Sequence, residues 1–446
     1  MNPRTSLSPA SRAPEDTARP RLSATSAQRR LLVLSATRWF PVGLIFGLTT
    51  LLPLERGLSL TEVGVILSAQ GFVVLGLELP TGGFADTWGR RPTLVVAALV
   101  GIASGVLFLT AHSFFAFFVA MALQGVYRAL DSGPLEAWYV DTAQADDPEV
   151  GVEQALSRAA TVIGVAIAVG ALVSGGLVAW DPWSGMSALV LPYTVAITLQ
   201  VAHAVATIVL VREPPRSPSP LTGRLAGLRS VARSAREVPQ LIGDGVRTLR
   251  TAPVLRSLVL VEVFWSVGMI AFETLNPARL AELVGGEERA GALYGPASAA
   301  AWGLFAVGSM LAGLASRRIG VGWTALVARV LNGCFIVAMG LAAGPVGLIA
   351  AYWLTYLTHG AAGPVHNTLL HRQATAANRA TVLSMNSMVG GACYSLGLLV
   401  LGPLAEYTST ATAMVVAGAF SLLGAVLYLP AIRVEKSAPV QDEPVP

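Results

Sequence analysis

Five of the charged residues inside the long apolar stretches of this 446-residue chain form two groups. Arg128, Asp131 and Glu136 occupy one stretch, and Glu262 and Glu273 occupy another. An ionisable side chain at membrane depth costs about 2.5–3.5 kcal/mol on insertion scales, so each needs a reason to be there. Carboxyl groups in such places take up and release protons or bind polar ligands.

The first group has the chemistry of a proton carrier. Arg128 and Asp131 are three residues apart and share one face of a helix. Burial favours the neutral form of Asp131, whereas a neighbouring arginine favours the ionised form. These opposed effects suit a carboxyl group that loads and releases a proton, with Glu136 as a further carboxyl group. A structural ion pair between Arg128 and Asp131 is the alternative.

The second group predicts a binding cavity. Glu262 and Glu273 are eleven residues apart, which is close to three helical turns and places them on one stripe. Trp265 and Met269 lie near that stripe. Acidic and aromatic side chains that face a cavity suit a cationic or amphipathic ligand. Alternatively, the two glutamates lie near opposite membrane surfaces and are solvated.

Five further ionisable residues fall in the apolar stretches. We expect Arg38 to extend its side chain toward a membrane interface. Arg329 is expected either to pair with a carboxylate or to extend in the same way. His203, His359 and His366 are expected mainly to be hydrogen-bonded packing residues, although histidine can titrate near neutral pH. No group of residues has metal-ligand spacing, so no metal site is predicted.

Twelve apolar stretches position these residues, and each is about long enough to cross a bilayer. The chain is 54% hydrophobic and only 13% charged, whereas a soluble domain carries about 25% charged residues. The sequence therefore predicts an all-α integral membrane protein. The expected spans are residues 31–54, 60–84, 93–111, 114–140, 156–180, 187–211, 254–280, 291–315, 322–343, 345–366, 381–405 and 409–432.

Basic residues outside the spans are concentrated on one side of this arrangement. If the N-terminus is cytoplasmic, nearly all arginines outside the spans are cytoplasmic too, which is the positive-inside pattern. We therefore expect a multi-pass protein of the cytoplasmic membrane with both termini inside. This topology accounts for the net charge of +4, and the sequence shows no basic face of the kind that binds nucleic acid.

The spans divide into two sets of six. The expected parts are a disordered N-terminal tail (1–29), a first bundle (30–211), a linker (212–253), a second bundle (254–433) and a C-terminal tail (434–446). Leucines and valines at near-helical spacing in the linker predict a basic amphipathic helix, and a solvated linker is the alternative. Gly82-x-x-x-Asp86-x-x-Gly89 has a degenerate echo in the second set, Gly313-x-x-x-Arg317-x-x-Gly320.

The turn after the second span carries a recognisable motif. Its residues are Gly82-Gly83-Phe84-Ala85-Asp86-Thr87-Trp88-Gly89-Arg90-Arg91. This turn, in a chain of twelve spans, resembles the signature loop of the major facilitator superfamily. The resemblance implies two pseudo-symmetric six-helix bundles that alternate between inward-open and outward-open states.

The resemblance also implies a latch between the bundles. Glycines at positions 82 and 89 allow close approach of helix ends. Asp86 is expected to face the positive N-terminus of the eleventh span, which begins near Asn378, a plausible cap. Arg90 or Arg91 is expected to pair with Asp141, although both arginines could serve topology alone.

Two segments are similar to a drug and metabolite efflux branch of that superfamily, Glu78-Leu79-Pro80-Thr81 and Ser132-Gly133-Pro134-Leu135-Glu136-Ala137-Trp138. We therefore expect proton antiport that exports a small amphipathic molecule and confers drug resistance. The fifth-span glycines depart from the antiporter motif, because Ala171 and Leu172 replace its Gly-Pro. An uptake symporter or uniporter remains an alternative, as does a transport-incompetent membrane sensor.

The expected partners are the substrate, protons and the lipid bilayer, and the expected state is a monomer. No phosphate loop of the form Gly-x-x-x-x-Gly-Lys-[Ser/Thr] and no nucleophile elbow of the form Gly-x-Ser-x-Gly occurs in the sequence. No cofactor and no enzymatic activity are therefore expected.

The motif generates a first prediction. Asp86→Asn is expected to abolish transport, because the neutral side chain loses its attraction to a helix N-terminus. Membrane insertion, measured by extraction and topology mapping, is expected to stay intact. Normal transport by this variant would contradict the expected latch.

Overall fold

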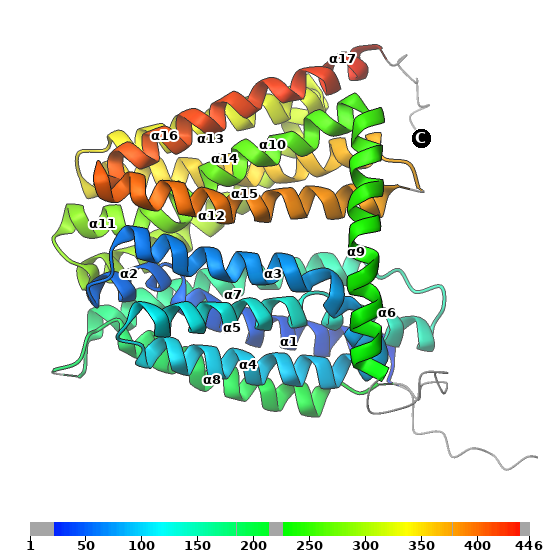
Figure 1. The fold of residues 1–446 in the computed structure, drawn as a ribbon, viewed down its shortest axis with the longest axis horizontal. Helices are drawn as coiled ribbons and strands as arrows, with labels where there is room; N and C mark the ends of the chain where they lie inside the picture. The colour runs from blue at the N-terminus through cyan, green and yellow to red at the C-terminus, as the bar shows by residue number, and fades with distance from the viewer. Residues whose placement is uncertain (1–21, 184, 214–225, 377, 438–446) are drawn as a thin grey trace, which may run out of the picture.

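The computed structural model describes residues 22–183, 185–213, 226–376 and 378–437. At residues 78–80, 82–87, 226–235, 237, 238 and 241 it describes the backbone alone. Helices make up the architecture of this part of the chain, arranged as two bundles side by side with one helix across an end of both (Figure 1). The all-α fold predicted from the sequence is confirmed.

The first bundle contains eight helical segments. They are α1 (Ala24–Ile45), α2 (Leu48–Glu55), α3 (Leu60–Trp88), α4 (Arg90–Thr110), α5 (Phe114–Asp131), α6 (Pro134–Asp146), α7 (Glu153–Trp180) and α8 (Val190–Leu210). The first of them begins at Ala24, ahead of the expected start near Leu31, because the Ser23 side chain accepts a hydrogen bond from the Ser26 amide and caps the helix.

The second bundle contains ten helical segments. They are α10 (Pro253–Ile270), η1 (Ala271–Leu275), α11 (Asn276–Val284), α12 (Glu287–Ile319), α13 (Val321–Leu341), α14 (Pro345–Gln373), α15 (Arg379–Tyr407), α16 (Thr410–Leu423), η2 (Gly424–Tyr428) and α17 (Leu429–Ser437), where η2 is a short 3₁₀ turn that continues α16 into α17. The segment η1 is a single π-helical turn that interrupts the long helix running from α10 into α11.

Eleven helical runs in the described residues are long and apolar enough to cross a membrane. The helix α14 occupies the position of a twelfth span between α13 and α15 but does not meet that criterion. It carries polar side chains that are buried inside the protein, among them Thr355, Thr358 and His366. The interior of the bundles therefore accounts for its lower hydrophobicity.

The helix α9 (Ala226–Thr251) runs across one end of both bundles (Figure 1) and contacts α3, α10 and α15. We call this the α9 end, and the other the opposite end. Gly245 of α9 packs against Met385 of α15, where an added Cβ would lie 2.6 Å from the Met385 Cγ. This helix therefore links the two bundles at the α9 end.

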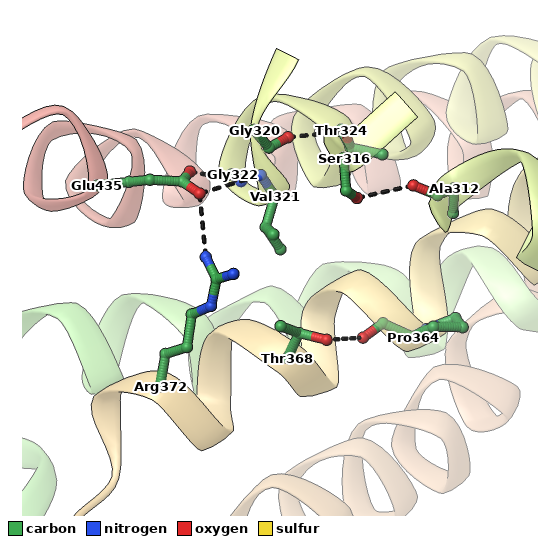
Figure 2. A network of polar contacts seen from close by, with 10 residues as sticks. All are labelled: Ala312, Ser316, Gly320, Val321, Gly322, Thr324, Pro364, Thr368, Arg372 and Glu435. Atoms are coloured by element: carbon green, nitrogen blue, oxygen red, sulfur yellow. Dashed lines mark hydrogen bonds and ion pairs between the residues drawn. The ribbon is translucent and has the colours of Figure 1, made fainter. Parts of the chain in front are cut away.

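A pair of related caps stabilises the α9 end. Gly320, with φ of 85°, ends α12 and begins α13, and the Glu435 carboxylate accepts hydrogen bonds from the Val321 and Gly322 amides at 3.1 and 2.9 Å (Figure 2). Arg372 of α14 donates to the same carboxylate at 3.1 Å (Figure 2). A carboxylate at a helix N-terminus is favoured by the helix dipole.

The first bundle repeats this device at the equivalent place. Gly89, with φ of 114°, begins α4, and Glu213 accepts a hydrogen bond from the Arg91 amide at 2.6 Å. Glu213 follows the last span of its bundle, as Glu435 does in the second. The internal echo noted in the sequence thus extends to the carboxylates that cap these two turns.

The opposite end is sealed by direct contact between the bundles. Gly175 of α7 and Gly295 of α12 touch backbone to backbone, since an added Cβ on Gly295 would lie 2.6 Å from the Gly175 Cα. Leu48, Leu189 and Tyr294 belong to one hydrophobic cluster shared by both bundles. No open path between the bundles is therefore left at this seam.

A glycine contact inside the second bundle gives a prediction. An added Cβ on Gly308 of α12 would lie 1.8 Å from the Leu357 carbonyl oxygen of α14, whereas one on Gly303 meets nothing within 4 Å. Gly308→Ala is therefore expected to cost about 1–3 kcal/mol and to lower the melting temperature in detergent. Gly303→Ala is the control and is expected to leave it unchanged or slightly raised. Equal melting temperatures of the two variants would contradict this packing.

Candidate functional site

A cavity of about 540 Å³ lies between the two bundles. The first bundle contributes α3 and α5 to its wall, and the second contributes α10, η1, α13, α14 and α15. Pockets of 300–1,000 Å³ typically take drug-sized ligands. Because both bundles line this space, a relative movement of the bundles changes access to it.

All four residues predicted for the cavity, Glu262, Trp265, Met269 and Glu273, lie in its wall. Both glutamates of the stripe therefore face one cavity. The π-helical turn η1 contains Glu273. Such a turn shifts the register of a helix and is frequent at functional sites.

Glu262 is 4% exposed and held by two neighbours. Its Oε1 accepts a hydrogen bond from the Asn386 Nδ2 at 3.0 Å and lies 3.3 Å from the His366 Nε2. The His366 Nδ1 lies 2.9 Å from the Tyr428 hydroxyl. A buried carboxyl, an imidazole and a phenol are thus connected in one chain of polar contacts, and His366 is a buried, hydrogen-bonded histidine as expected.

Glu273 has a different set of partners at the other part of the cavity. Its Oε2 accepts a hydrogen bond from the Tyr394 hydroxyl at 3.3 Å, and that hydroxyl lies 3.0 Å from the Thr274 Oγ1. The charge of Arg128, which lines the cavity from α5, acts on Glu273. The cavity therefore holds cationic groups in addition to the acidic and aromatic side chains expected from the sequence.

The expected pairing of Arg128 with Asp131 is wrong. Asp131 is 7% exposed and forms its ion pair with the Nε of Arg38, from α1. The guanidinium of Arg38 also stacks on Trp39, with 4.3 Å from its central carbon to the ring centroid. Arg38 therefore does not extend toward an interface, because a buried carboxylate on α5 attracts it. Spacing along α5 could not reveal a partner on another helix.

Glu136 lies apart from this pair. α5 ends at Asp131, Gly133 adopts φ of 89°, and α6 restarts at Pro134, so the fourth span is broken between the two carboxyl groups. The side chain of Glu136 is exposed and is absent from the cavity wall. The three residues of the predicted coupling group thus have three different environments.

The motif residues lie at the α9 end. The Arg90 Nη2 and the Asp141 Oδ2 are 3.3 Å apart, so the expected ion pair forms with Arg90. Arg91 instead donates from its Nη2 to the Ile208 carbonyl at 2.6 Å. Gly82 and Asp86 lie in the last turns of α3, and the structure describes only their backbone.

Asn378 does not act as the predicted cap of the eleventh span. α15 begins at Arg379, next to the expected place, but the Asn378 side chain accepts no hydrogen bond from the amides of the first turn of α15. The Asn378 Oδ1 accepts a hydrogen bond from the Thr375 amide at 2.8 Å instead. The side chain thus closes the turn before the helix.

Sequence reasoning missed part of the cavity wall. α15 supplies polar and small residues at helical spacing, namely Leu383, Asn386, Ser387, Gly390, Gly391, Tyr394 and Ser395. This stripe of small and polar residues was the signal that could have identified it. Asn386 and Tyr394 matter most, because they hold the two glutamates.

Comparison with known proteins identifies the family. Residues 31–344 match the model of the Major Facilitator Superfamily. No protein of curated function matches the sequence.

Solved structures share the fold at low sequence identity. The nucleoside transporter NupG superposes with a TM-score of 0.72 at 12% identity, covering 91% of this chain and 99% of that one. A bacterial homolog of the human lysosomal transporter Spinster gives 0.72 at 14% identity, covering 95% and 100%. A structure of proton-dependent oligopeptide transporters gives 0.68 at 12%, covering 93% and 100%.

A family match over most of the chain, eleven candidate spans among the described residues and a cavity between two bundles agree with one another. The chain is a membrane-embedded transporter of small molecules, not an enzyme, and it belongs to the Major Facilitator Superfamily.

Proposed function

We propose that this transporter exports a small amphipathic drug or metabolite across the cytoplasmic membrane by proton antiport. The observation that carries the proposal is the cavity of about 540 Å³, which combines apolar wall residues with ionisable groups from both bundles. Leu67, Val74 and Met269 offer an apolar surface, and Glu262 and Glu273 offer polar contacts. Such a mixture suits a molecule with an apolar body and a polar group.

The α9 end is assigned to the cytoplasm. It carries Arg90 and Arg91 at the start of α4, Arg317 and Arg318 at the end of α12, and Arg372 at the end of α14. Basic residues in short loops favour the cytoplasmic side. With the opposite end sealed by the glycine contacts, the cavity belongs to the cytoplasmic half of the transport cycle.

Asp131 is the proposed coupling carboxyl, with Arg38 as its partner in place of Arg128. An ionised Asp131 holds Arg38 through a buried ion pair between α1 and α5. Protonation of Asp131 removes that attraction and frees a guanidinium inside the first bundle, which favours rearrangement. Arg90 and Asp141 then belong to the gate at the α9 end, together with Asp86, Gly82, Gly89 and Arg91.

Structural neighbours keep one alternative open. Similar solved structures include a nucleoside transporter and proton-dependent oligopeptide transporters, so the fold also serves polar substrates and proton coupling. A symporter that imports a polar nutrient is the competing function. The direction of proton coupling separates the two.

Transport by purified protein in liposomes tests the proposal. For protein inserted inside-out, a pH gradient with an acidic liposome interior is expected to drive uptake of anionic, neutral or cationic amphipathic dyes. Asp131→Asn is expected to reduce this gradient-driven uptake at least tenfold. Asp181→Asn, an exposed carboxylate in the α7–α8 connection, is the matched control. Uptake driven only by an acid exterior would indicate symport, and indifference to both gradient and Asp131 would overturn the coupling.

The Arg38–Asp131 pair makes a separate prediction about stability. Arg38→Met leaves a buried carboxylate without its partner and is expected to cost about 3–5 kcal/mol, whereas the double variant Arg38→Met/Asp131→Asn is expected to recover much of that loss. Thermal melting in detergent measures the four proteins of this cycle. Additive losses in the double variant would mean that the pair is not energetically coupled.

A further inference from the structure

Arg329 of α13 is buried without a carboxylate partner among the described residues. Its side chain is 1% exposed, and Nε, Nη1 and Nη2 meet no acceptor at full hydrogen-bond geometry, although the Tyr428 hydroxyl lies close enough to interact with the guanidinium. It lies in the wall of the central cavity, about 12 Å along α13 from the first residue of that helix. Its guanidinium carbon lies 4.5 Å from the ring centroid of Trp265, another wall residue.

The aromatic contact does not compensate for this burial. A desolvated cation over an aromatic face gains less free energy than the burial of an ion costs. The five N–H donors of a guanidinium also need acceptors, and a π face satisfies few of them. The site therefore lacks an anion or a strong acceptor.

The carboxylates of the cavity are engaged elsewhere. Glu262 is held by Asn386 and His366, and Glu273 by Tyr394, with Arg128 as the cation that acts on it. Asp131 is paired with Arg38. Among the described residues, no carboxylate oxygen lies within the 4 Å of an ion pair with Arg329, although five other such pairs are present.

We propose that Arg329 binds an acidic group of the transported molecule, so that the substrate is an organic anion with an aromatic or otherwise apolar body. This inference rests on the proposed transport through the central cavity. The planar fork of a guanidinium matches a carboxylate with two parallel hydrogen bonds, which a neutral group does not reproduce.

The surroundings of Arg329 fit the rest of such a molecule. Trp265 and Met269 provide an aromatic and a thioether surface next to it. Gly363 of α14 and Gly391 of α15 also line the cavity, and an added Cβ on either meets nothing within 4 Å. At these two glycines no side chain narrows the cavity, which leaves room for the apolar body of a ligand.

Direct binding of two matched probes tests the proposal. 1-Naphthylacetate and its amide, 1-naphthylacetamide, have nearly the same shape and differ in charge. Calorimetric titration of purified protein in detergent is expected to show the acid binding at least tenfold more tightly. Arg329→Gln is expected to remove this preference, and Arg329→Lys to retain part of it, because lysine keeps the charge but loses the fork. Arg433→Gln, an exposed arginine of the same bundle, is the control.

A second measurement keeps a purely structural role of Arg329 distinguishable. Removing an unpaired buried cation is expected to raise the melting temperature of Arg329→Gln in the absence of ligand. Equal affinities of acid and amide, no binding of the acid at millimolar concentration, or a preference that survives Arg329→Gln would each overturn the proposal. Because this assay involves no gradient, binding without proton-driven transport would refute the antiport alone.

Discussion

A charge inside the two bundles needs a partner, because water is not there to solvate it. This constraint organises the interior. Asp131 draws Arg38 across from α1, Asn386 and His366 converge on Glu262, and Tyr394 turns its hydroxyl toward Glu273. Each contact joins two helices that are distant in sequence, so the polar groups fix which helices pack together. Each of these contacts can also be exchanged during a transport cycle, since protonation or a bound substrate can replace one of the two partners.

The contacts between the bundles differ in kind from those within each bundle. At the opposite end the seam is glycine backbone against glycine backbone, at Gly175 and Gly295, with the Glu288 and Glu406 carboxylates accepting from backbone amides of the first bundle at its rim. Water can replace both hydrogen bonds when the seam opens. Side chains also meet across this seam, since Gly291 packs against Leu189 and Gly47 packs against Tyr294. Opening the seam separates these contacts but leaves the helix packing inside each bundle in place.

Local sequence patterns predicted the fold, but they did not predict the contacts between residues far apart in the sequence. Span length, the Gly82–Arg91 turn and the Arg90–Asp141 pair follow from composition, spacing and family resemblance. The stripe of Glu262, Trp265, Met269 and Glu273 followed from helical periodicity, and these residues do line one cavity. The partner of Asp131 did not follow, because α1 and α5 meet only in three dimensions. The break at Gly133 likewise separated Glu136 from a group that looked continuous in sequence.

The paired caps at the α9 end explain how the bundles move as units. Glu213 binds the start of α4 and Glu435 binds the start of α13, each within its own bundle. Charge-assisted hydrogen bonds of this kind are about twice as strong as neutral ones. They join the last span of each bundle to its third, so each turn made flexible by Gly89 or Gly320 is held in place. A bundle that is braced in this way moves as a unit when a buried charge changes its partner, so the change of shape falls on the seam between the bundles.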